Sequence, residues 1–131
     1  MDAQAELRNL GFVPVGAIRP IDVGKSCKAC FTADVTGHAV YALVVGDEIK
    51  KFGKTRKGVR ERISGHASAL KGIMADPTGH PLDPFKRLAP LVIAARQEIH
   101  VWARPSSAGS YAKEELELNL KHKPDWVGRP D

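Results

Sequence analysis

Residues 40–66 read VYALVVGDEIKKFGKTRKGVRERISGH, and this stretch decides the fold that we expect. It begins with alternation that suits a strand, turns at Gly46-Asp47, and returns through a second short strand to Gly53. The apolar residues then change to helical spacing. Polar side chains suited to chemistry occur at each stage, namely Tyr41, Lys51, Arg62 and His66. The stretch therefore predicts a β-hairpin followed by a helix, with candidate reactive groups on both.

The loop of this hairpin decides which side chains share a face of the sheet. With a three-residue loop over 45–47, Tyr41 stands opposite Lys51. With a two-residue turn at Gly46-Asp47, Tyr41 faces Phe52 instead. The sequence leaves both registers open, and a role for Lys51 beside the phenol requires the first.

The helix is expected over about 57–71, with an apolar stripe formed by Val59, Ile63, Ala67 and Leu70. At about 100° per residue, Arg62 and His66 project together from one edge of that stripe, whereas Arg60 lies on its far side. Arg62 is thus the better candidate for a site. Arg60 is the better candidate for a solvent-exposed or peripheral phosphate contact.

The N-terminal residues 1–36 are expected to form an extension that packs on a domain spanning 37–131. A short helix is predicted over 2–10 and irregular or edge-like structure over 12–21, where Pro14, Gly16 and Pro20 interrupt the pattern.

Beyond the first helix of the domain, we expect a Pro-rich loop over 76–84 and a helix to about residue 96, kinked or divided at Pro90. A strand over 99–105 and a final helix over 111–121 follow. The order in the domain is strand, strand, helix, helix, strand, helix, an α/β (α+β) pattern.

In the final helix, Glu115 and Asn119 fall between two apolar arcs, one of which contains Ala112, Leu116 and Leu120. A carboxylate framed by apolar side chains is costly to bury without a cation, metal or hydrogen-bond partner. Glu115 is therefore a candidate metal ligand, and a structural pairing with Lys or Arg is the alternative.

The composition fits one soluble domain with a basic bias. The chain has 131 residues, of which 43% are hydrophobic, and a formal net charge of +5. Basic residues concentrate in one segment, a pattern that favours a polyanionic partner or forms a solvated face; they are Lys50, Lys51, Lys54, Arg56, Lys57, Arg60 and Arg62. No signal peptide or run of about 20 apolar residues is evident, so we expect a cytoplasmic protein without a membrane partner.

Cys27 and Cys30 have the spacing of half a zinc site. Only His38 lies nearby, and no second paired motif supplies the remaining ligands. Two reduced thiols are the preferred interpretation, and a zinc-stabilised interaction domain is the alternative.

These motifs, taken in order, resemble the GIY-YIG nuclease family over about residues 37–126. Ala39-Val40-Tyr41 stands where the first tripeptide of the family would be, and Lys51-Phe52-Gly53 stands at the second. Arg62 and His66 resemble the helical Arg and His of the family. ELELNLKHKPDW, with Glu115 nine residues before Pro124, resembles its C-terminal helix and following segment.

The resemblance implies a small three-stranded antiparallel sheet flanked by helices, and cleavage of DNA phosphodiesters with one divalent ion, Mg²⁺ or Mn²⁺. Glu115 would hold the metal. The other implied catalytic residues are Tyr41, Lys51, Arg62 and His66. DNA backbone contacts are expected from Lys50, Lys54, Arg56, Lys57 and Arg60, with specificity coming from a homodimer, a targeting partner protein or DNA structure.

Two positions depart from the family pattern: Lys51 replaces the second tyrosine, and Val127 replaces the Asn usual after the C-terminal aromatic residue. A neutral lysine would accept the proton of Tyr41, whereas a charged one would stabilise its phenolate. A DNA-binding module of the same fold that has lost catalysis through Lys51 is the main alternative.

Overall fold

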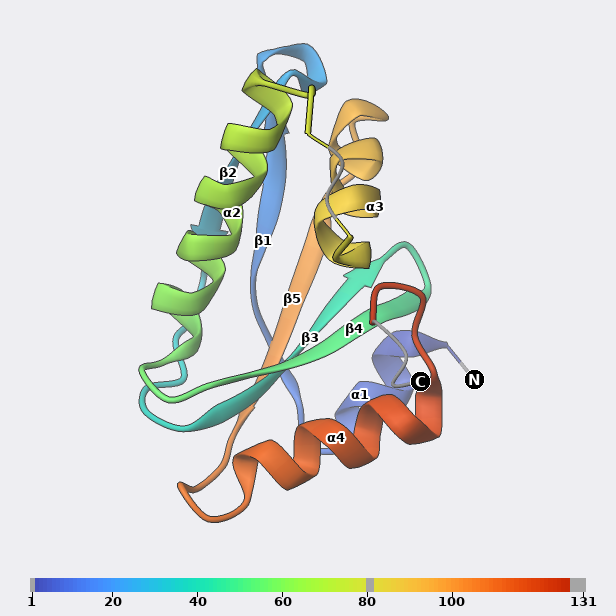
Figure 1. The fold of residues 1–131 in the computed structure, drawn as a ribbon. Coiled ribbons are helices and arrows are strands. Elements are labelled where there is room, and N and C mark those ends of the chain that lie inside the picture. Colours follow the sequence, from blue (N-terminus) through green and yellow to red (C-terminus); the bar gives the residue numbers. More distant parts are fainter. Residues whose placement is uncertain (1, 80–81, 128–131) are drawn as a thin grey trace.

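The computed structural model describes residues 2–79 and 82–127. Its elements run in the order α1 (Ala3–Asn9), β1 (Val13–Ile21), η1 (Asp22–Gly24), β2 (Ser26–Phe31), β3 (Ala39–Val45), β4 (Glu48–Thr55), α2 (Val59–Ala75), α3 (Pro84–Ala94), β5 (Ile99–Pro105) and α4 (Tyr111–His122) (Figure 1). The predicted loop over 76–84 and the predicted domain end at 131 lie partly outside the described residues. Over the described ranges, none of the helices is both long and apolar enough to cross a membrane.

The strands form one antiparallel sheet of five, in the order β2-β1-β5-β3-β4. The sheet is therefore larger than the three strands predicted from the sequence, because β1 and β2 continue it beyond β5. The interpretation of 12–21 as irregular or edge-like was also wrong, since β1 lies between β2 and β5. Pro14 is tolerated inside the sheet because the pairing with β5 shifts between Pro14 and Gly16.

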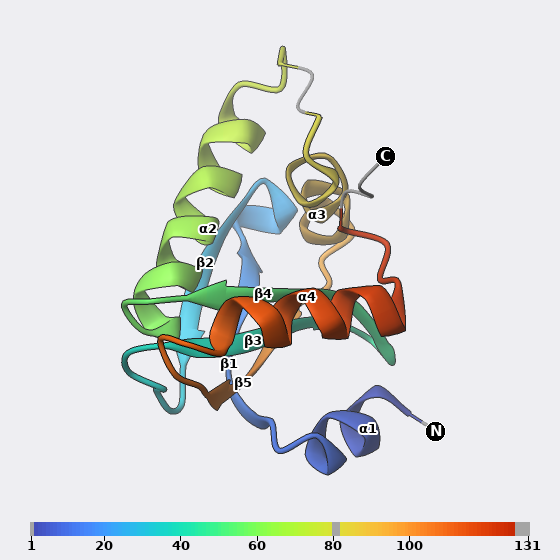
Figure 2. The same cartoon turned by 60° about the horizontal axis from the view of Figure 1, so that its bottom comes forward.

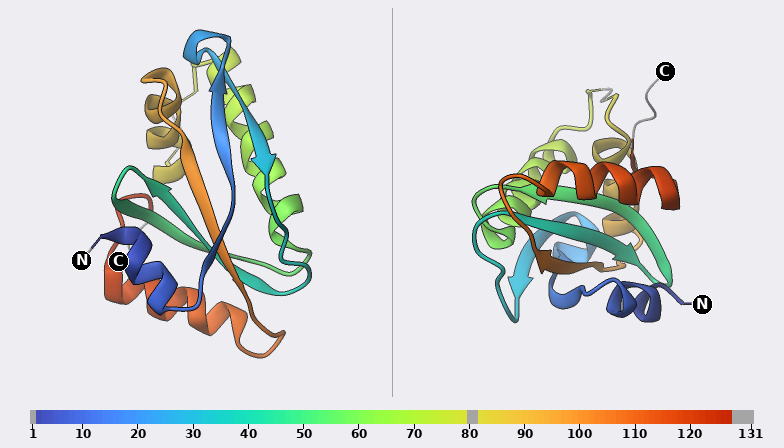
Figure 3. Two further views of the ribbon diagram at one scale, coloured as in Figure 1. Left: turned by 180° about the vertical axis from the view of Figure 1, so that it is seen from behind. Right: turned by 90° about the horizontal axis from the view of Figure 1, so that it is seen from below.

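Two helices pack on each face of the sheet. One core cluster packs α2 and α3 against the face that carries Tyr41 and Leu43. The other packs α1 and α4 against the face that carries Val40, Phe52 and Trp102. The views in Figures 2 and 3 show α4 running alongside β4, and Glu6 of α1 contacts His122 at the end of α4. The hairpin β3–β4 thus lies between the two helical groups.

The hairpin uses neither of the two registers that the sequence suggested. A two-residue turn pairs Val45 with Glu48, but the register shifts between Leu43 and Val44, so that Leu43 pairs with Lys51 and Tyr41 pairs with Gly53. This bulge places one extra residue in β4. Lys51 consequently shares a face with Tyr41, although the three-residue loop that was thought necessary does not form.

Two details of the helices also differ from the predictions. Helix α3 is one continuous helix with Pro90 inside it rather than two pieces. In α4, the arc of Ala112, Leu116 and Leu120 faces solvent, and Leu118 is the residue that enters the core. The docking of α4 on β4 therefore uses the face that carries Leu118 and Asn119.

Candidate active site

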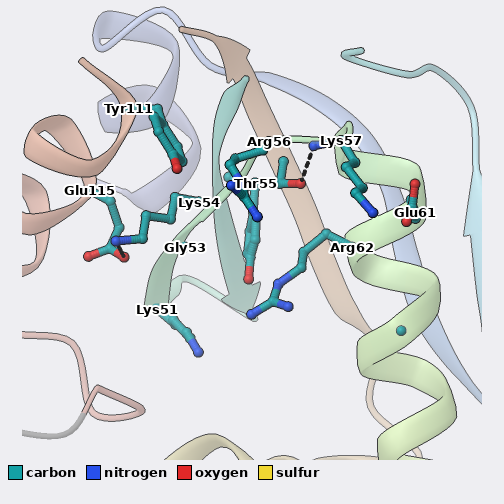
Figure 4. Close-up of a pocket in the computed structure, with 12 residues that line it drawn as sticks. Lys51, Gly53, Lys54, Thr55, Arg56, Lys57, Glu61, Arg62, Tyr111 and Glu115 are labelled. Carbon is teal, nitrogen blue, oxygen red and sulfur yellow. Dashed lines mark hydrogen bonds and ion pairs between the residues drawn. The ribbon is translucent and has the colours of Figure 1, made fainter. Parts of the chain in front are cut away.

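A pocket with a volume of about 520 Å³ opens between β4, the start of α2 and the start of α4 (Figure 4). Its lining comes from segments far apart in the chain because α4 lies along the edge of the hairpin. The lining residues are Tyr41, Lys51, Gly53, Lys54, Thr55, Arg56, Lys57, Glu61, Arg62, Gly65, Tyr111 and Glu115. Five of these are basic, so the pocket suits an anionic ligand.

Tyr41 lines this pocket and forms a hydrogen-bonded pair with His66, which lies behind it and does not line the pocket. The phenolic oxygen of Tyr41 lies 2.7 Å from Nε2 of His66. The Tyr41 ring lies over Gly53, where a Cβ would collide with the ring and its hydroxyl. Glycine at position 53 thus allows the tyrosine to lie flat on β4 and to reach the helix.

The protonation of the pair follows from its surroundings. Burial, together with the positive charges of Lys51 and Arg62, lowers the pKa of His66 from 6.5 to about 4. Burial raises the pKa of Tyr41 to about 12, although the nearby Arg62 acts in the opposite direction. At neutral pH the phenol and the imidazole are therefore both uncharged, and the hydrogen bond joins two neutral groups.

Lys51 extends toward the same region from β4, and its Nζ lies 5.3 Å from the centroid of the Phe85 ring. Burial lowers the pKa of Lys51, while Asp83 partly opposes the shift. The Phe85 ring also contacts the ring of His66, at 4.8 Å between centroids. Phe85 is thus a shared apolar support for the lysine and the histidine.

The remaining predicted basic residues divide into two groups. Arg62, Lys54, Arg56 and Lys57 line the pocket, and Figure 4 shows Arg62 directed into it.

Lys50 and Arg60 do not line the pocket. The ammonium of Lys50 pairs with Glu48 at 2.6 Å and with Asp125 at 3.4 Å. The guanidinium of Arg60 lies 5.1 Å from the centroid of the Phe31 ring. Helical geometry therefore separates Arg62 from Arg60 as the sequence predicted.

Glu115 faces Lys51 and Arg62 across the pocket from α4. Its Oε2 lies 3.9 Å from Nζ of Lys54, and its Oε1 accepts a hydrogen bond of 3.3 Å from Asn119. The Glu115 side chain is 22% exposed, so it is accessible from the pocket.

The chemistry of this carboxylate is compatible with a hard divalent cation. Within residues 2–79 and 82–127, His, Cys, Asp and Glu side chains do not gather in threes to form a ready-made metal site. Mg²⁺, however, is commonly held by one or two carboxylates, with water and substrate phosphates completing its shell. A single accessible carboxylate in a basic pocket fits that pattern.

The two cysteines do not converge. Cys27 is buried in the core, with its Sγ 3.7 Å from the carbonyl oxygen of Ala67. Cys30 lies three residues along the same regular strand, so its side chain projects from the opposite face. The two thiols therefore cannot ligate one zinc ion without rearrangement of β2.

Sequence reasoning gave no role to two residues of the site. Tyr111 lines the pocket one helical turn before Glu115, and its ring is held edge-on by His38 at 4.9 Å between centroids. The i, i+4 spacing from Glu115 is the signal that would have found it. Phe85 has no comparable local signal, because only the packing of α3 brings it beneath Lys51 and His66.

The fold is that of GIY-YIG-like nucleases. Neither family models nor curated protein sequences match this chain. The similarity is therefore evident in the three-dimensional structure and in the short motifs, rather than in overall sequence.

Solved structures that resemble this chain include two endonucleases. One is a mutant of bacteriophage T4 EndoII, with a TM-score of 0.73 and 17% sequence identity over 98% of this chain and 100% of that chain. The other is the restriction endonuclease HPY188I in complex with product DNA, with a TM-score of 0.58 and 11% identity over 100% of this chain and 87% of that chain. At these identities the likeness concerns the fold.

Proposed function

We propose that this protein is a DNA endonuclease that hydrolyses phosphodiester bonds with one divalent cation, Mg²⁺ or Mn²⁺. The observation that carries the proposal is the hydrogen-bonded Tyr41–His66 pair, whose tyrosine lines one basic pocket together with Arg62 and Glu115. The endonuclease structures with a similar fold support it, and one of them contains product DNA.

Proton transfer is assigned to Tyr41 and His66. Because the pKa of Tyr41 is about 12, Tyr41 is not present as a phenolate that could deprotonate the attacking water at neutral pH. The phenol instead receives a proton from the attacking water as it passes its own proton to Nε2 of neutral His66. A bound phosphate would offset the charges of Lys51 and Arg62, and this raises the basicity of His66 when it is needed.

Phosphate binding is assigned to the cations of the pocket. Arg62 presents a planar fork of donors that suits two nonbridging oxygens. Lys51, held in the same region by Phe85, adds a charge at the scissile phosphate. Lys54, Arg56 and Lys57 would hold the flanking backbone.

Glu115 would hold the divalent ion, which when bound supplies positive charge for the leaving oxygen. Oε2 of Glu115 is the oxygen that faces Lys54, whereas Oε1 is engaged by Asn119. In this arrangement Lys54 balances the charge of the carboxylate, and a phosphate bound in the pocket would lie between Tyr41 and Glu115.

One observation favours a second function, a DNA-binding module without catalysis. Lys51 stands where the second motif of the GIY-YIG family has tyrosine, and that side chain supplies charge but no phenol. Such a module would use the same basic pocket for binding.

Single-turnover cleavage of plasmid and branched DNA with Mg²⁺ or Mn²⁺ separates the two functions. For an enzyme, Glu115→Gln and Arg62→Ala abolish cleavage while DNA binding is retained. Glu117→Gln is the matched control, because this carboxylate lies on the same helix and pairs with Lys113 outside the pocket. Wild-type protein that binds every DNA form and cleaves none would support the binding module.

A further inference from the structure

Asn119 connects the edge of the sheet to the carboxylate of the pocket. Its side chain lies on α4 one turn after Glu115, on the face that docks against β4. The Oδ1 atom accepts a hydrogen bond of 3.1 Å from the backbone N–H of Phe52. The Nδ2 atom donates to the backbone carbonyl of Phe52 at 2.9 Å and to Oε1 of Glu115 at 3.3 Å.

These contacts determine the orientation of the amide. Phe52 lies in edge strand β4 and offers one donor and one acceptor from its backbone. The Asn119 amide satisfies both, so rotation by 180° about its last bond would lose both hydrogen bonds. One N–H of Nδ2 is used on the carbonyl, and the other is therefore available to Glu115.

The fixed amide in turn restricts Glu115. With Oε1 engaged by Asn119, Oε2 is the oxygen that lies toward Lys54. Without such a hydrogen bond, a glutamate side chain on a helix samples several rotamers. The hydrogen bond from Asn119 selects one of these rotamers. Because Asn119 is itself bonded to β4, the Glu115 carboxylate is held in a fixed position relative to the strand that carries Lys51 and Gly53.

We propose that Asn119 is a positioning residue for the divalent-ion site: its amide, locked on the backbone of Phe52, holds Oε1 of Glu115 and leaves Oε2 toward the pocket. The inference rests on the proposed function, because it assumes that Glu115 receives the metal. Hydrogen-bonding partners of metal ligands typically change metal affinity by about 10–100-fold when removed. A single hydrogen bond of 3.3 Å to a partly exposed carboxylate places the expected effect near the lower limit.

The test measures Mn²⁺ binding, by electron paramagnetic resonance of the free ion, for wild type, Asn119→Ala, Asn119→Asp, Glu115→Gln and the control Glu117→Gln. Asn119→Asp retains an acceptor for the Phe52 N–H but no longer donates to Glu115, and it brings a second charge beside the carboxylate. We expect about tenfold weaker Mn²⁺ binding by Asn119→Ala, wild-type binding by Glu117→Gln, and no further loss when Asn119→Ala is added to Glu115→Gln. Thermal unfolding of each variant identifies a temperature at which every variant compared is folded.

The contrary outcomes are distinct. Mn²⁺ binding by Asn119→Ala within twofold of wild type, together with clear loss in Glu115→Gln, would overturn the role of Asn119 alone. Wild-type Mn²⁺ binding by Glu115→Gln would refute the proposed metal site and with it the role of Asn119. If Asn119→Ala does not fold, Asn119→Asp decides the question, because the aspartate no longer donates to Oε1 of Glu115. Weaker Mn²⁺ binding than wild type supports the role of Asn119, and unchanged or tighter binding overturns it.

Discussion

Lowering the pH from 8 to 4 should destabilise this protein through His66. The imidazole is partly buried against Tyr41 and Phe85, and its pKa in the folded protein is about 4, compared with 6.5 when it is exposed. Because the folded-state pKa is the lower one, the unfolded chain binds the proton first. The stability contributed by neutral His66 is fully present above pH 6.5 and is lost as the pH falls through 4.

The magnitude follows from the difference between the two values. Each pKa unit corresponds to about 1.4 kcal/mol, so His66 alone should lower the free energy of unfolding by about 3 kcal/mol between pH 8 and pH 4. Carboxylates also titrate in this range and must be subtracted. His66→Gln is the matched control, because glutamine does not titrate and its side-chain oxygen can still accept a hydrogen bond from Tyr41.

Urea unfolding at pH 8, 6 and 4 gives the free energy of unfolding for both proteins, provided that the dependence on urea concentration keeps one slope. The wild type should lose about 3 kcal/mol more than His66→Gln over this range, with most of the difference arising below pH 6. Parallel loss of stability in the two proteins would refute the reasoning. Titration of the His66 ring by NMR with a midpoint near 6.5 would refute it as well.

Three further substitutions test the geometry of the pocket. Gly53→Ala places a Cβ against the Tyr41 ring, so thermal unfolding should show a loss of about 1–3 kcal/mol in stability, and DNA cleavage should fall in a protein that is still folded. Arg62→Lys keeps the charge but loses the planar fork, and it should reduce single-turnover cleavage about 100-fold with little change in DNA affinity. Lys54→Ala should weaken DNA binding and reduce its salt dependence by about one phosphate contact. Lys50→Ala is the control and should change neither quantity, because Lys50 is paired with acidic side chains. Fluorescence anisotropy at several salt concentrations measures both the affinity and its salt dependence.

The part of the fold that the sequence predicts is the part specified by local patterns. A continuous apolar run rich in Val defines β3, and alternation defines β5. The 3.6-residue spacing of Val59, Ile63, Ala67 and Leu70 defines α2. β1 was not predicted as an interior strand, since Pro14 and Pro20 normally argue against one. Its place between β2 and β5 depends on a register shift at Pro14, which is a tertiary feature that no local pattern reveals.

The candidate site shows the same division. Helical angle alone separates Arg62 from Arg60, and the pocket contains Arg62. Tyr41 and Lys51 share a face, as the register with a three-residue loop predicted, but they do so through a bulge in β4 that neither simple register contained. The contact between Asn119 and Phe52 joins residues that are 67 positions apart, and sequence periodicity carries no information about such a pairing.

Removal of the hydroxyl group of Tyr41 tests the central proposal most directly. Tyr41→Phe keeps the aromatic ring on Gly53 and removes only the hydroxyl that contacts His66. In single-turnover cleavage with Mg²⁺ or Mn²⁺, the wild type should cleave DNA, and Tyr41→Phe should be at least about 100-fold slower at equal DNA affinity. Equal cleavage rates for the two proteins, or DNA binding by the wild type without cleavage of linear, supercoiled or branched DNA, would contradict a catalytic role for this pocket.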